Sequence, residues 1–351
     1  MKRFLACICA CSILVCLGLT ACGSQPGAAL TVNDSADIGS GIFSYFLNNE
    51  LYSGAGAYDS DAISASTLDC LAYITVNSEC ASLGIRLGGT EKAECSLETN
   101  ALWRLYSDYL TQIGVSKEDF FRIKQYEYLK EALRFALYDR GGYREIPDND
   151  LKAYFNANYA GIKYYYESLY TVLSEDTLAS MTQTQRADYA ASAAAANERY
   201  DTFTKMATLV NSGQFTIDEA YMAATGDVNE GVSVNTTVVG ADSTNFSAEF
   251  IDAVFSQYEG TTFIVTNADR SYIYFVERVG LFDEGDGLFD QYREECLINY
   301  SESFLTNEIN TRSAGFKAVR HTDTVDACLE RVKSVDRNKY GFSSALGIAE
   351  N

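Results

Sequence analysis

Few residues of this chain belong to the types that usually carry acid–base, thiol or metal chemistry. Histidine occurs once, as His321, and we interpret it as a surface residue. None of the ten cysteines is spaced as Cys-x-x-Cys, which excludes zinc-ribbon and thioredoxin-type sites. The sequence also lacks the motifs GxSxG and HExxH and the phosphate-binding P-loop. We therefore expect neither a metal ion nor a cofactor.

Cys22 is the residue with the clearest covalent chemistry. A short basic start precedes an apolar stretch over residues 4–19, which is the layout of a secretory signal peptide. Residues 19–22 (LTAC) resemble the bacterial lipobox, in which the cysteine is acylated and becomes the first residue of the mature protein. Two or more acyl chains at one residue anchor a protein durably. The sequence therefore predicts a signal peptide over residues 1–21, a tether over 22–29, and lipid anchoring through Cys22 on the extracytoplasmic face of the bacterial cell membrane.

Five cysteines remain after the predicted signal peptide and the lipidated position. They are Cys70, Cys80, Cys95, Cys296 and Cys328. An odd number at irregular spacing does not form the framework of a small disulfide-rich domain. We expect free, buried thiols, and one bridge among the first three is the alternative in an oxidising compartment.

The charge and composition exclude two classes of partner. The chain has 27 Lys+Arg against 48 Asp+Glu over 351 residues, a formal net charge of −21. A surface this acidic repels nucleic-acid phosphates, and it disfavours binding to anionic lipid through a basic patch. Hydrophobic residues make up 47% of the chain, which is enough for sizeable cores, so we expect a folded protein of about two domains.

Hydrophobic periodicity predicts helices in the first part of the chain. Apolar residues recur at helical spacing over residues 36–52, 91–113 and 116–138. Ser116 and Asp119 have the spacing of a capping box, which predicts the start of the third of these helices.

Strand signals begin in the second half of the chain. Residues 163–173 are aromatic and β-branched, and residues 262–266 and 271–279 flank a turn as the two arms of a β-hairpin do. Between them, residues 182–213 predict a long helix. A strand, several helices and a hairpin in succession predict a small α+β domain. A last helical pattern covers residues 288–312.

Several short signatures, in this order, resemble the SurA/PrsA group of extracytoplasmic foldases. Residues 30–34 (LTVND), followed by a helix, are similar to the opening of that family. Residues 114–120 (GVSKEDF) and 146–155 (IPDNDLKAYF) resemble the end of its helical chaperone domain and the entry into its isomerase domain. Residues 249–260 (EFIDAVFSQYEG) and the strand 271–277 resemble the last third of a parvulin-type prolyl isomerase.

The resemblance implies an α+β fold class and a domain order. It implies a helical chaperone domain over residues 30–160 and an inserted, parvulin-like α+β domain over residues 161–281. A C-terminal helix over residues 282–318 would pack back on the first domain and complete it. Residues 319–351 are expected to form a tail, whose role the sequence leaves open.

Parvulin sites resemble one another in a pair of histidines on facing strands, an acid or cysteine between them, and an apolar proline pocket. The resemblance places the histidine positions at Leu169 and Tyr272, or at Ile273 if the alignment shifts by one residue. Asp227 falls near the position of the acid. Because neither histidine is present, we expect isomerase activity to be weak or lost.

Phe250 and Phe255 are the candidate walls of the proline pocket, and the alternative interpretation makes them ordinary core residues. The resemblance implies a membrane-anchored chaperone or foldase that binds unfolded or newly secreted polypeptides. Two alternatives stay open. One is an active parvulin-type peptidyl-prolyl isomerase with a site rebuilt around Asp227 and Tyr272, and the other is a solute-binding lipoprotein, a class that needs repeated strand–helix units. The sequence leaves the clients and the oligomeric state open.

Overall fold

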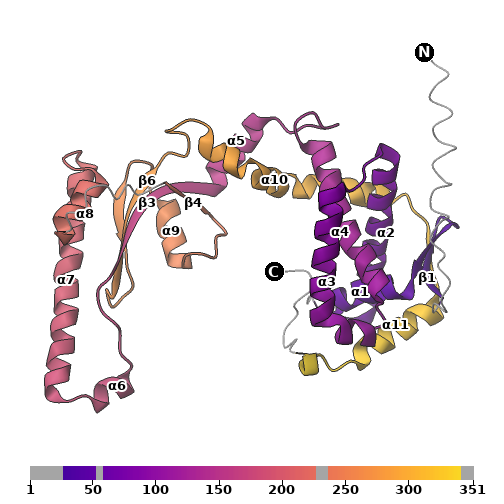
Figure 1. Cartoon of the computed structure of the whole chain (residues 1–351), viewed down its shortest axis with the longest axis horizontal. Helices are drawn as coiled ribbons and strands as arrows, with labels where there is room; N and C mark the ends of the chain where they lie inside the picture. The colour runs from indigo at the N-terminus through magenta and orange to yellow at the C-terminus, as the bar shows by residue number, and fades with distance from the viewer. Residues whose placement is uncertain (1–26, 53–57, 227–235, 341–351) are drawn as a thin grey trace. The chain divides into compact units, whose positions relative to one another are not determined.

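The computed structural model describes residues 27–52, 58–226 and 236–340, and the fold class is α+β (Figure 1). The chain divides into two compact units. Unit 1 comprises Met1–Ile146 and Ser301–Asn351, and unit 2 comprises Pro147–Tyr300. We describe each unit by itself.

Four helices form most of unit 1 between residues 40 and 138. They are α1 (Ser40–Tyr52), α2 (Asp59–Leu83), α3 (Gly89–Gln112) and α4 (Lys117–Tyr138). The predicted capping box at the start of α4 is confirmed, because the Asp119 N–H donates to Ser116 Oγ at 3.1 Å and the Ser116 N–H donates to Asp119 Oδ2 at 3.2 Å. Gly114 has a φ of +90°, which a residue with a Cβ rarely adopts, and so permits the sharp turn from α3 into α4.

A three-stranded antiparallel sheet completes unit 1 in the order β2-β1-β7. Its strands are β1 (Ala28–Val32), β2 (Ala36–Gly39) and β7 (Ala318–Arg320). Asn33 and Asp34 form the tight turn between β1 and β2 with positive φ values of 51° and 56°, a conformation that Asn and Asp tolerate better than other residues with a Cβ.

Residues after 319, which we expected to form a tail, contribute to the core of unit 1. Strand β7 pairs with β1, and it is followed by α11 (Thr322–Ser334) and a short 3₁₀ helix (Arg337–Tyr340). Val325, Cys328 and Val332 of α11 are buried in the same cluster as Phe43 of α1. Their spacing of three and four residues places them on one face of the helix, which explains why this segment packs.

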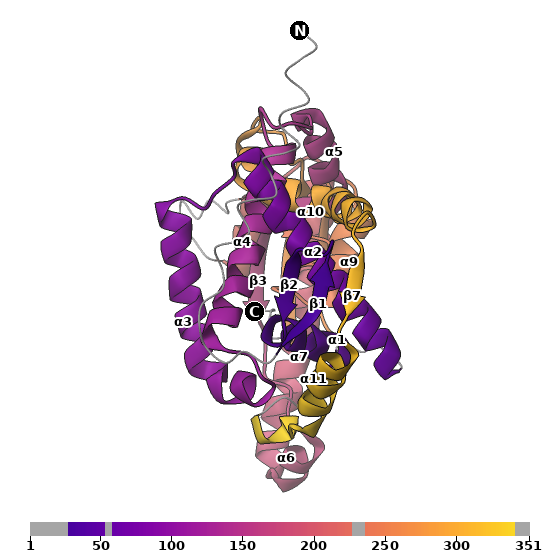
Figure 2. The same ribbon diagram turned by 90° about the vertical axis from the view of Figure 1, so that its right-hand side faces the viewer.

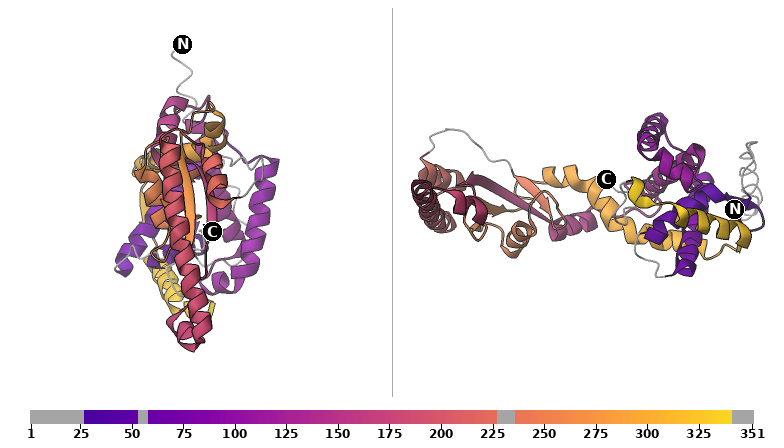
Figure 3. Two further views of the ribbon diagram at one scale, coloured as in Figure 1. Left: turned by 90° about the vertical axis from the view of Figure 1, so that its left-hand side faces the viewer. Right: turned by 90° about the horizontal axis from the view of Figure 1, so that it is seen from below.

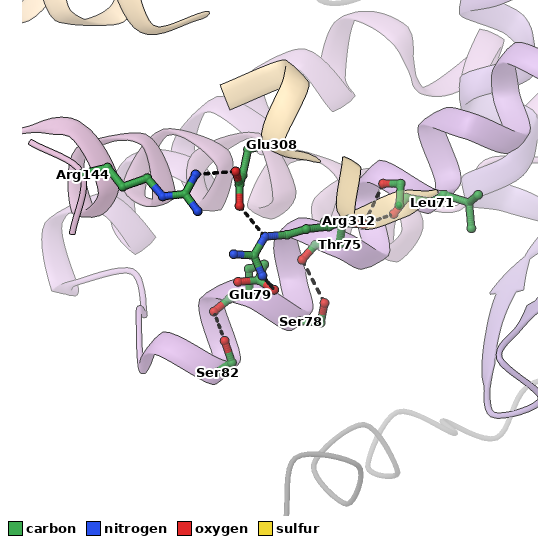
Figure 4. Close-up of polar contacts among 9 residues, drawn as sticks. Leu71, Thr75, Ser78, Glu79, Ser82, Arg144, Glu308 and Arg312 are labelled. Atoms are coloured by element: carbon green, nitrogen blue, oxygen red, sulfur yellow. Dashed lines mark hydrogen bonds and ion pairs between the residues drawn. The ribbon is translucent and has the colours of Figure 1, made fainter. Parts of the chain in front are cut away.

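Charged pairs tie the second half of α10 (Gly287–Ser313) into unit 1 (Figure 4). The Arg312 guanidinium contacts Glu79 of α2 at 2.5 Å and Glu308 of its own helix at 2.7 Å. Arg144 contacts the other carboxylate oxygen of Glu308 at 2.5 Å. The hydrogen bonds from these two arginines hold the pKa of the Glu308 carboxyl below its usual value.

Unit 2 contains a four-stranded antiparallel sheet in the order β4-β3-β6-β5. Its strands are β3 (Tyr159–Ser168), β4 (Thr237–Gly240), β5 (Thr262–Val265) and β6 (Tyr272–Val279). The predicted hairpin is confirmed as β5 and β6. The strand predicted from residue 163 begins earlier, at Tyr159, because its first residues pair with β4, a partner distant in the sequence.

Five further helices lie wholly within unit 2, and three of them cover the two faces of this sheet. The five are α5 (Asp148–Asn158), α6 (Glu175–Ser180), α7 (Gln183–Asn211), α8 (Ile217–Thr225) and α9 (Ala248–Ser256). Helices α7 and α8 lie on one side of the sheet and α9 on the other (Figure 1), and α7 runs along the strands (Figure 3). Phe203, Ile273 and Phe275 are buried on the α7 side, whereas Ile162, Phe250 and Val276 are buried on the α9 side.

Helix α5 and the first half of α10 belong to unit 2, because their aromatic side chains pack against one another there. The Phe155 ring of α5 lies 6.0 Å from Phe289 and 5.8 Å from Tyr292, both in the first half of α10. The unit therefore begins and ends at residues 147 and 300, whereas the resemblance implied a domain over residues 161–281.

A solute-binding lipoprotein needs repeated strand–helix units. The described residues between 27 and 146 (27–52 and 58–146) do not show such repeats. Among the residues that the structure describes, no helix is both long and apolar enough to cross a membrane.

Candidate functional site

Aromatic rings line the face of the unit 2 sheet on which α9 packs. Side chains alternate between the two faces of a strand, so Tyr164 and Tyr166 of β3 and Tyr272 and Tyr274 of β6 share this face. Tyr166 lies directly opposite Tyr274, with ring centroids 4.9 Å apart, and 6.1 Å from the ring of Tyr272. The four tyrosines thus form a continuous patch across two neighbouring strands.

Two phenylalanines at α9 extend the patch. Ser247 caps the helix, since its Oγ accepts the N–H of Phe250 at 3.3 Å, and this fixes where α9 begins. The rings of Phe246 and Phe250 stack at 4.4 Å, and Phe250 lies 4.8 Å from the ring of Tyr274 in an edge-on arrangement. We call this set the aromatic face; its members are Tyr164, Tyr166, Phe246, Phe250, Tyr272 and Tyr274.

The aromatic face is buried at one end and open at the other. Phe250 is 1% exposed and fills the space between α9 and the strands. Tyr166 is 51% exposed, and its neighbours Tyr272 and Tyr274 are partly exposed. A chain lying across the open end would therefore meet ring faces and phenolic hydroxyls together.

Two of the residues that the sequence predicted, Tyr272 and Phe250, belong to the aromatic face. Leu169 does not, because it packs with Ile273 and Phe275 on the opposite face, against α7 and α8. The residue directly across from Tyr272 is Ser168. The predicted pair Leu169 and Tyr272 is therefore divided between the two faces of the sheet, whereas Leu169 and the alternative position, Ile273, share a face.

Phe255, the other predicted pocket wall, contacts a buried arginine. The Arg278 guanidinium lies 5.5 Å from the centre of the Phe255 ring, and its Nη1 donates to the carbonyl of Val254 at 3.3 Å. Arg278 is 9% exposed, and burial lowers the pKa of its guanidinium. Cys22 and Asp227 lie outside the described residues.

The single histidine lies in unit 1, at the start of α11, and its prediction as a surface residue is confirmed. The Nε2 atom of His321 lies 2.8 Å from Thr31 Oγ1, which donates to Asp37 Oδ1 at 2.7 Å. Because Thr31 donates its hydroxyl proton to the Asp37 carboxylate, its oxygen can accept a hydrogen bond from Nε2 of His321. The contact joins β1, β2 and the turn after β7.

At the open end of the aromatic face, the hydroxyl of Tyr274 stays protonated at neutral pH. Burial, and then the neighbouring rings of Tyr166, Tyr164 and Tyr272, raise the pKa of the Tyr274 phenol. Protonated phenols both donate and accept hydrogen bonds, so this face can bind peptide groups without carrying a charge.

Among the residues that the structure describes, no group of three or more His, Cys, Asp or Glu side chains could hold a metal ion.

Four members of the aromatic face were not predicted as site residues from the sequence: Tyr164, Tyr166, Phe246 and Tyr274. A usable signal exists, because tyrosines recur two residues apart at 164 and 166 and again at 272 and 274, which puts each pair on one face of its strand. The two pairs share a face because of the register in which β3 pairs with β6. This register cannot be read from the sequence alone.

All five cysteines of the described chain are free and buried, as expected. Burial raises the pKa of each thiol, to about 11 for Cys80 and Cys296. A buried thiol with a raised pKa is a poor nucleophile, so none of these residues has the properties of a reactive site.

No protein-family model matches this chain, and no curated protein sequence matches it. Among solved structures, it is similar to the foldase protein PrsA from Streptococcus pneumoniae, with 12% identity, 80% of this chain and 89% of that chain covered, and a TM-score of 0.30. It is also similar to the foldase protein PrsA from Lactococcus lactis, with 14% identity, coverage of 90% and 97%, and a TM-score of 0.29. For PrsA from Bacillus subtilis the identity is 12%, the coverage 79% and 86%, and the TM-score 0.26. Likenesses of this size carry no assignment of function.

Proposed function

We propose that this protein is a membrane-anchored extracytoplasmic chaperone or foldase that binds unfolded or newly secreted polypeptides on the aromatic face of unit 2. The observation that carries the proposal is the open end of that face, where half-exposed Tyr166 lies beside Tyr272 and Tyr274. The predicted lipidation of Cys22 would hold the protein on the extracytoplasmic face of the cell membrane. Prolyl isomerase activity is weak or lost.

Tyrosine suits the binding of many different unfolded chains. Its ring offers a wide apolar contact area, and its hydroxyl offers a hydrogen bond at the edge, so affinity does not depend on one sequence. A sheet face of this kind would accept proline rings and aromatic side chains of a client. The formal net charge of −21 opposes association between copies that carry such a face.

The expectation of weak isomerase activity follows from what rotation about a prolyl bond requires. The barrier is ~18–20 kcal/mol, and a catalyst lowers it by holding the twisted amide in an apolar site with hydrogen bonds that the planar amide does not receive. At the position that the resemblance assigns to the family's second histidine, Tyr272 offers a phenol, and the residue opposite it is Ser168, which offers a hydroxyl. Active isomerisation is the alternative, and it would have to use Tyr272 together with Asp227.

Client binding can be tested with the chain beginning at Gly23 and two probes. One probe is a fluorescent peptide that contains proline and aromatic residues, and the other is a reduced, unfolded protein whose aggregation is followed by light scattering. We expect Tyr166→Ala with Tyr272→Ala to weaken peptide binding about tenfold or more, because each ring contact contributes ~0.5–1.5 kcal/mol. The same variant should suppress aggregation less well.

A matched control is Tyr143→Ala in unit 1, which removes a tyrosine that is 70% exposed but lies outside the aromatic face. Equal weakening by both variants, or unchanged binding by the double variant, would refute the proposed surface. A prolyl isomerisation assay on the same chains separates the two functions. Acceleration well above the spontaneous rate that is lost with Tyr272→Phe would favour the active isomerase.

A further inference from the structure

The outer edge of strand β3 is open over its second half. β3 pairs with β6 from Gly161 to Ser168, but it pairs with β4 only from Tyr159 to Ile162. The four residues beside β4 are buried, and from Lys163 onward the strand is partly or fully exposed. Within residues 27–52, 58–226 and 236–340, no strand pairs with this edge beyond Ile162.

The hydrogen bonds of β3 show which backbone groups this edge presents. In an antiparallel pair, alternate residues direct both their N–H and their C=O to the same neighbouring strand. The N–H of Leu169 donates to the carbonyl of Ser271 at 2.7 Å, in continuation of the pairing with β6. Odd-numbered residues of β3 therefore face β6, and Tyr164, Tyr166 and Ser168 direct their N–H and C=O groups outward.

The other sheet edges in the described part of the chain are capped or short. At β5, the Asn211 side chain takes the place of a strand: its Oδ1 accepts the N–H of Thr262 at 2.7 Å, and its Nδ2 donates to the Thr262 carbonyl at 2.8 Å. Strand β4 has four residues, and the edge strands of unit 1, β2 and β7, have four and three (Figure 2). Proteins usually shorten or cover sheet edges, because an open edge can pair with another extended chain.

We propose that an extended segment of a client adds to unit 2 as a strand at this edge, in line with β4 and antiparallel to β3. This inference rests on the proposed function and names the form in which a client binds. The client backbone bonds to Tyr164 and Tyr166, whose rings already belong to the aromatic face. Residues directly opposite each other in antiparallel strands share a face, so the client residues that bond here also place their side chains against these rings.

The geometry defines the class of ligand. It is an extended polypeptide segment with apolar side chains at alternate positions, which is the mode of binding known as strand addition. Tyr164 and Ser168 are four residues apart, so the open edge is about 13 Å long at ~3.3 Å per residue. A proline in the client fits only between the bonding positions, because it has no N–H to donate.

N-methylation of a peptide tests the edge without changing the protein. The probe is a fluorescent six-residue peptide with capped ends, with Phe at two alternate positions and Thr elsewhere, added to the chain beginning at Gly23. An N-methyl group removes one backbone donor and keeps a neighbouring strand from approaching. We expect methylation of a Phe residue to weaken binding about tenfold or more. Methylation of the Thr between them is the matched control and should change binding less than about twofold, since that N–H points away from β3.

Amide hydrogen exchange of the protein gives an independent readout. In the free chain, the N–H of Tyr166 faces outward and should exchange rapidly, whereas the N–H of Tyr165 faces β6 and should be protected. Addition of the peptide should slow exchange at Tyr166 about tenfold or more and leave Tyr165 unchanged, so that Tyr165 serves as the internal control.

The outcomes separate this inference from the proposed function. If Tyr166→Ala with Tyr272→Ala leaves the binding of this peptide unchanged, the client surface itself is refuted, and strand addition with it. If that variant weakens binding but methylation of Phe and of Thr has equal effects, clients bind the rings alone and strand addition is overturned. A Tyr166 N–H that is already protected in the free protein also overturns it, because the chain itself then closes the edge.

Discussion

Asp69 is the acidic residue whose environment most opposes its charge, and its replacement should stabilise unit 1 in a pH-dependent way. It lies on α2, and its carboxyl is hydrogen-bonded to that of Glu50 on α1. Burial, and secondarily the Glu50 charge, raise the pKa of Asp69 from 3.8 to about 7. In the unfolded chain neither influence remains.

The sign of the effect follows from proton binding. Between pH 4 and pH 7 the folded protein keeps a proton on Asp69 that the unfolded chain releases. The free energy of unfolding therefore falls as pH rises through this range, and it levels off above the folded pKa. Each pKa unit is equivalent to ~1.4 kcal/mol, so three units set an upper limit of about 4 kcal/mol. Because Asp69 is only partly buried, we expect about half of this.

Asp69→Asn removes the titration and keeps the size of the side chain. We expect the variant to match the parent protein near pH 4 and to exceed its free energy of unfolding by about 2 kcal/mol at pH 8. Urea unfolding at several pH values measures this. The only tryptophan, Trp103, lies in α3 with its ring 6.1 Å from Phe120, so its fluorescence reports the unfolding of unit 1.

Asp108→Asn provides the control, because it removes an exposed aspartate from α3. It should change the free energy of unfolding by a similar small amount at every pH. If the difference between Asp69→Asn and the parent protein stays constant from pH 5 to pH 8, the paired carboxyl groups do not oppose folding and the reasoning is wrong.

Three further predictions concern the core, a buried charge and the thiols. Phe250→Ala should cost ~3–5 kcal/mol of unit 2 stability, whereas Tyr166→Ala, at a half-exposed position, should cost less than about 1 kcal/mol; hydrogen exchange of the unit 2 strands distinguishes them. Arg134→Ala should lower the stability of unit 1, followed by Trp103 fluorescence, by about 3 kcal/mol, because Arg134 is 1% exposed and bridges Glu131 and Glu302. Ellman's reagent should react with the native thiols only slowly, over hours or longer, and with all five at once in urea; fast reaction of the native chain would contradict their burial.

The local elements were predictable wherever their signals lie within a few neighbouring residues. The capping box of Ser116 and Asp119 marks the start of α4, and the helix ends at Tyr138 as its apolar pattern predicts. The hairpin of β5 and β6 follows from two β-branched and aromatic runs around one turn. Caps and turns act over three or four residues, so their free energies are nearly independent of the remaining fold.

The candidate site was predictable only in part. Phe250 and Tyr272 were singled out through a resemblance, and they do share the aromatic face. Leu169 was paired with Tyr272, or with Ile273, through the same resemblance, and the choice matters because a shift of one residue in a strand reverses the face of every side chain. The sequence pattern is compatible with either placement of these residues on the two faces of the sheet. The packing of α9 on one face and α8 on the other selects one placement.

The order of helix and strand patterns predicted a small α+β domain, the positions of most helices and the burial of the cysteines, because composition and periodicity reflect how much apolar surface must be covered. Only the tertiary structure decided that β7 pairs with β1 and that α11 enters the core instead of forming a tail. Leu30 and Arg320 face each other across 290 residues, and a three-residue strand has no local signal of its own. Its stability comes from a partner distant in the chain, and the loop-closure entropy of such a pairing is offset only when the whole unit folds.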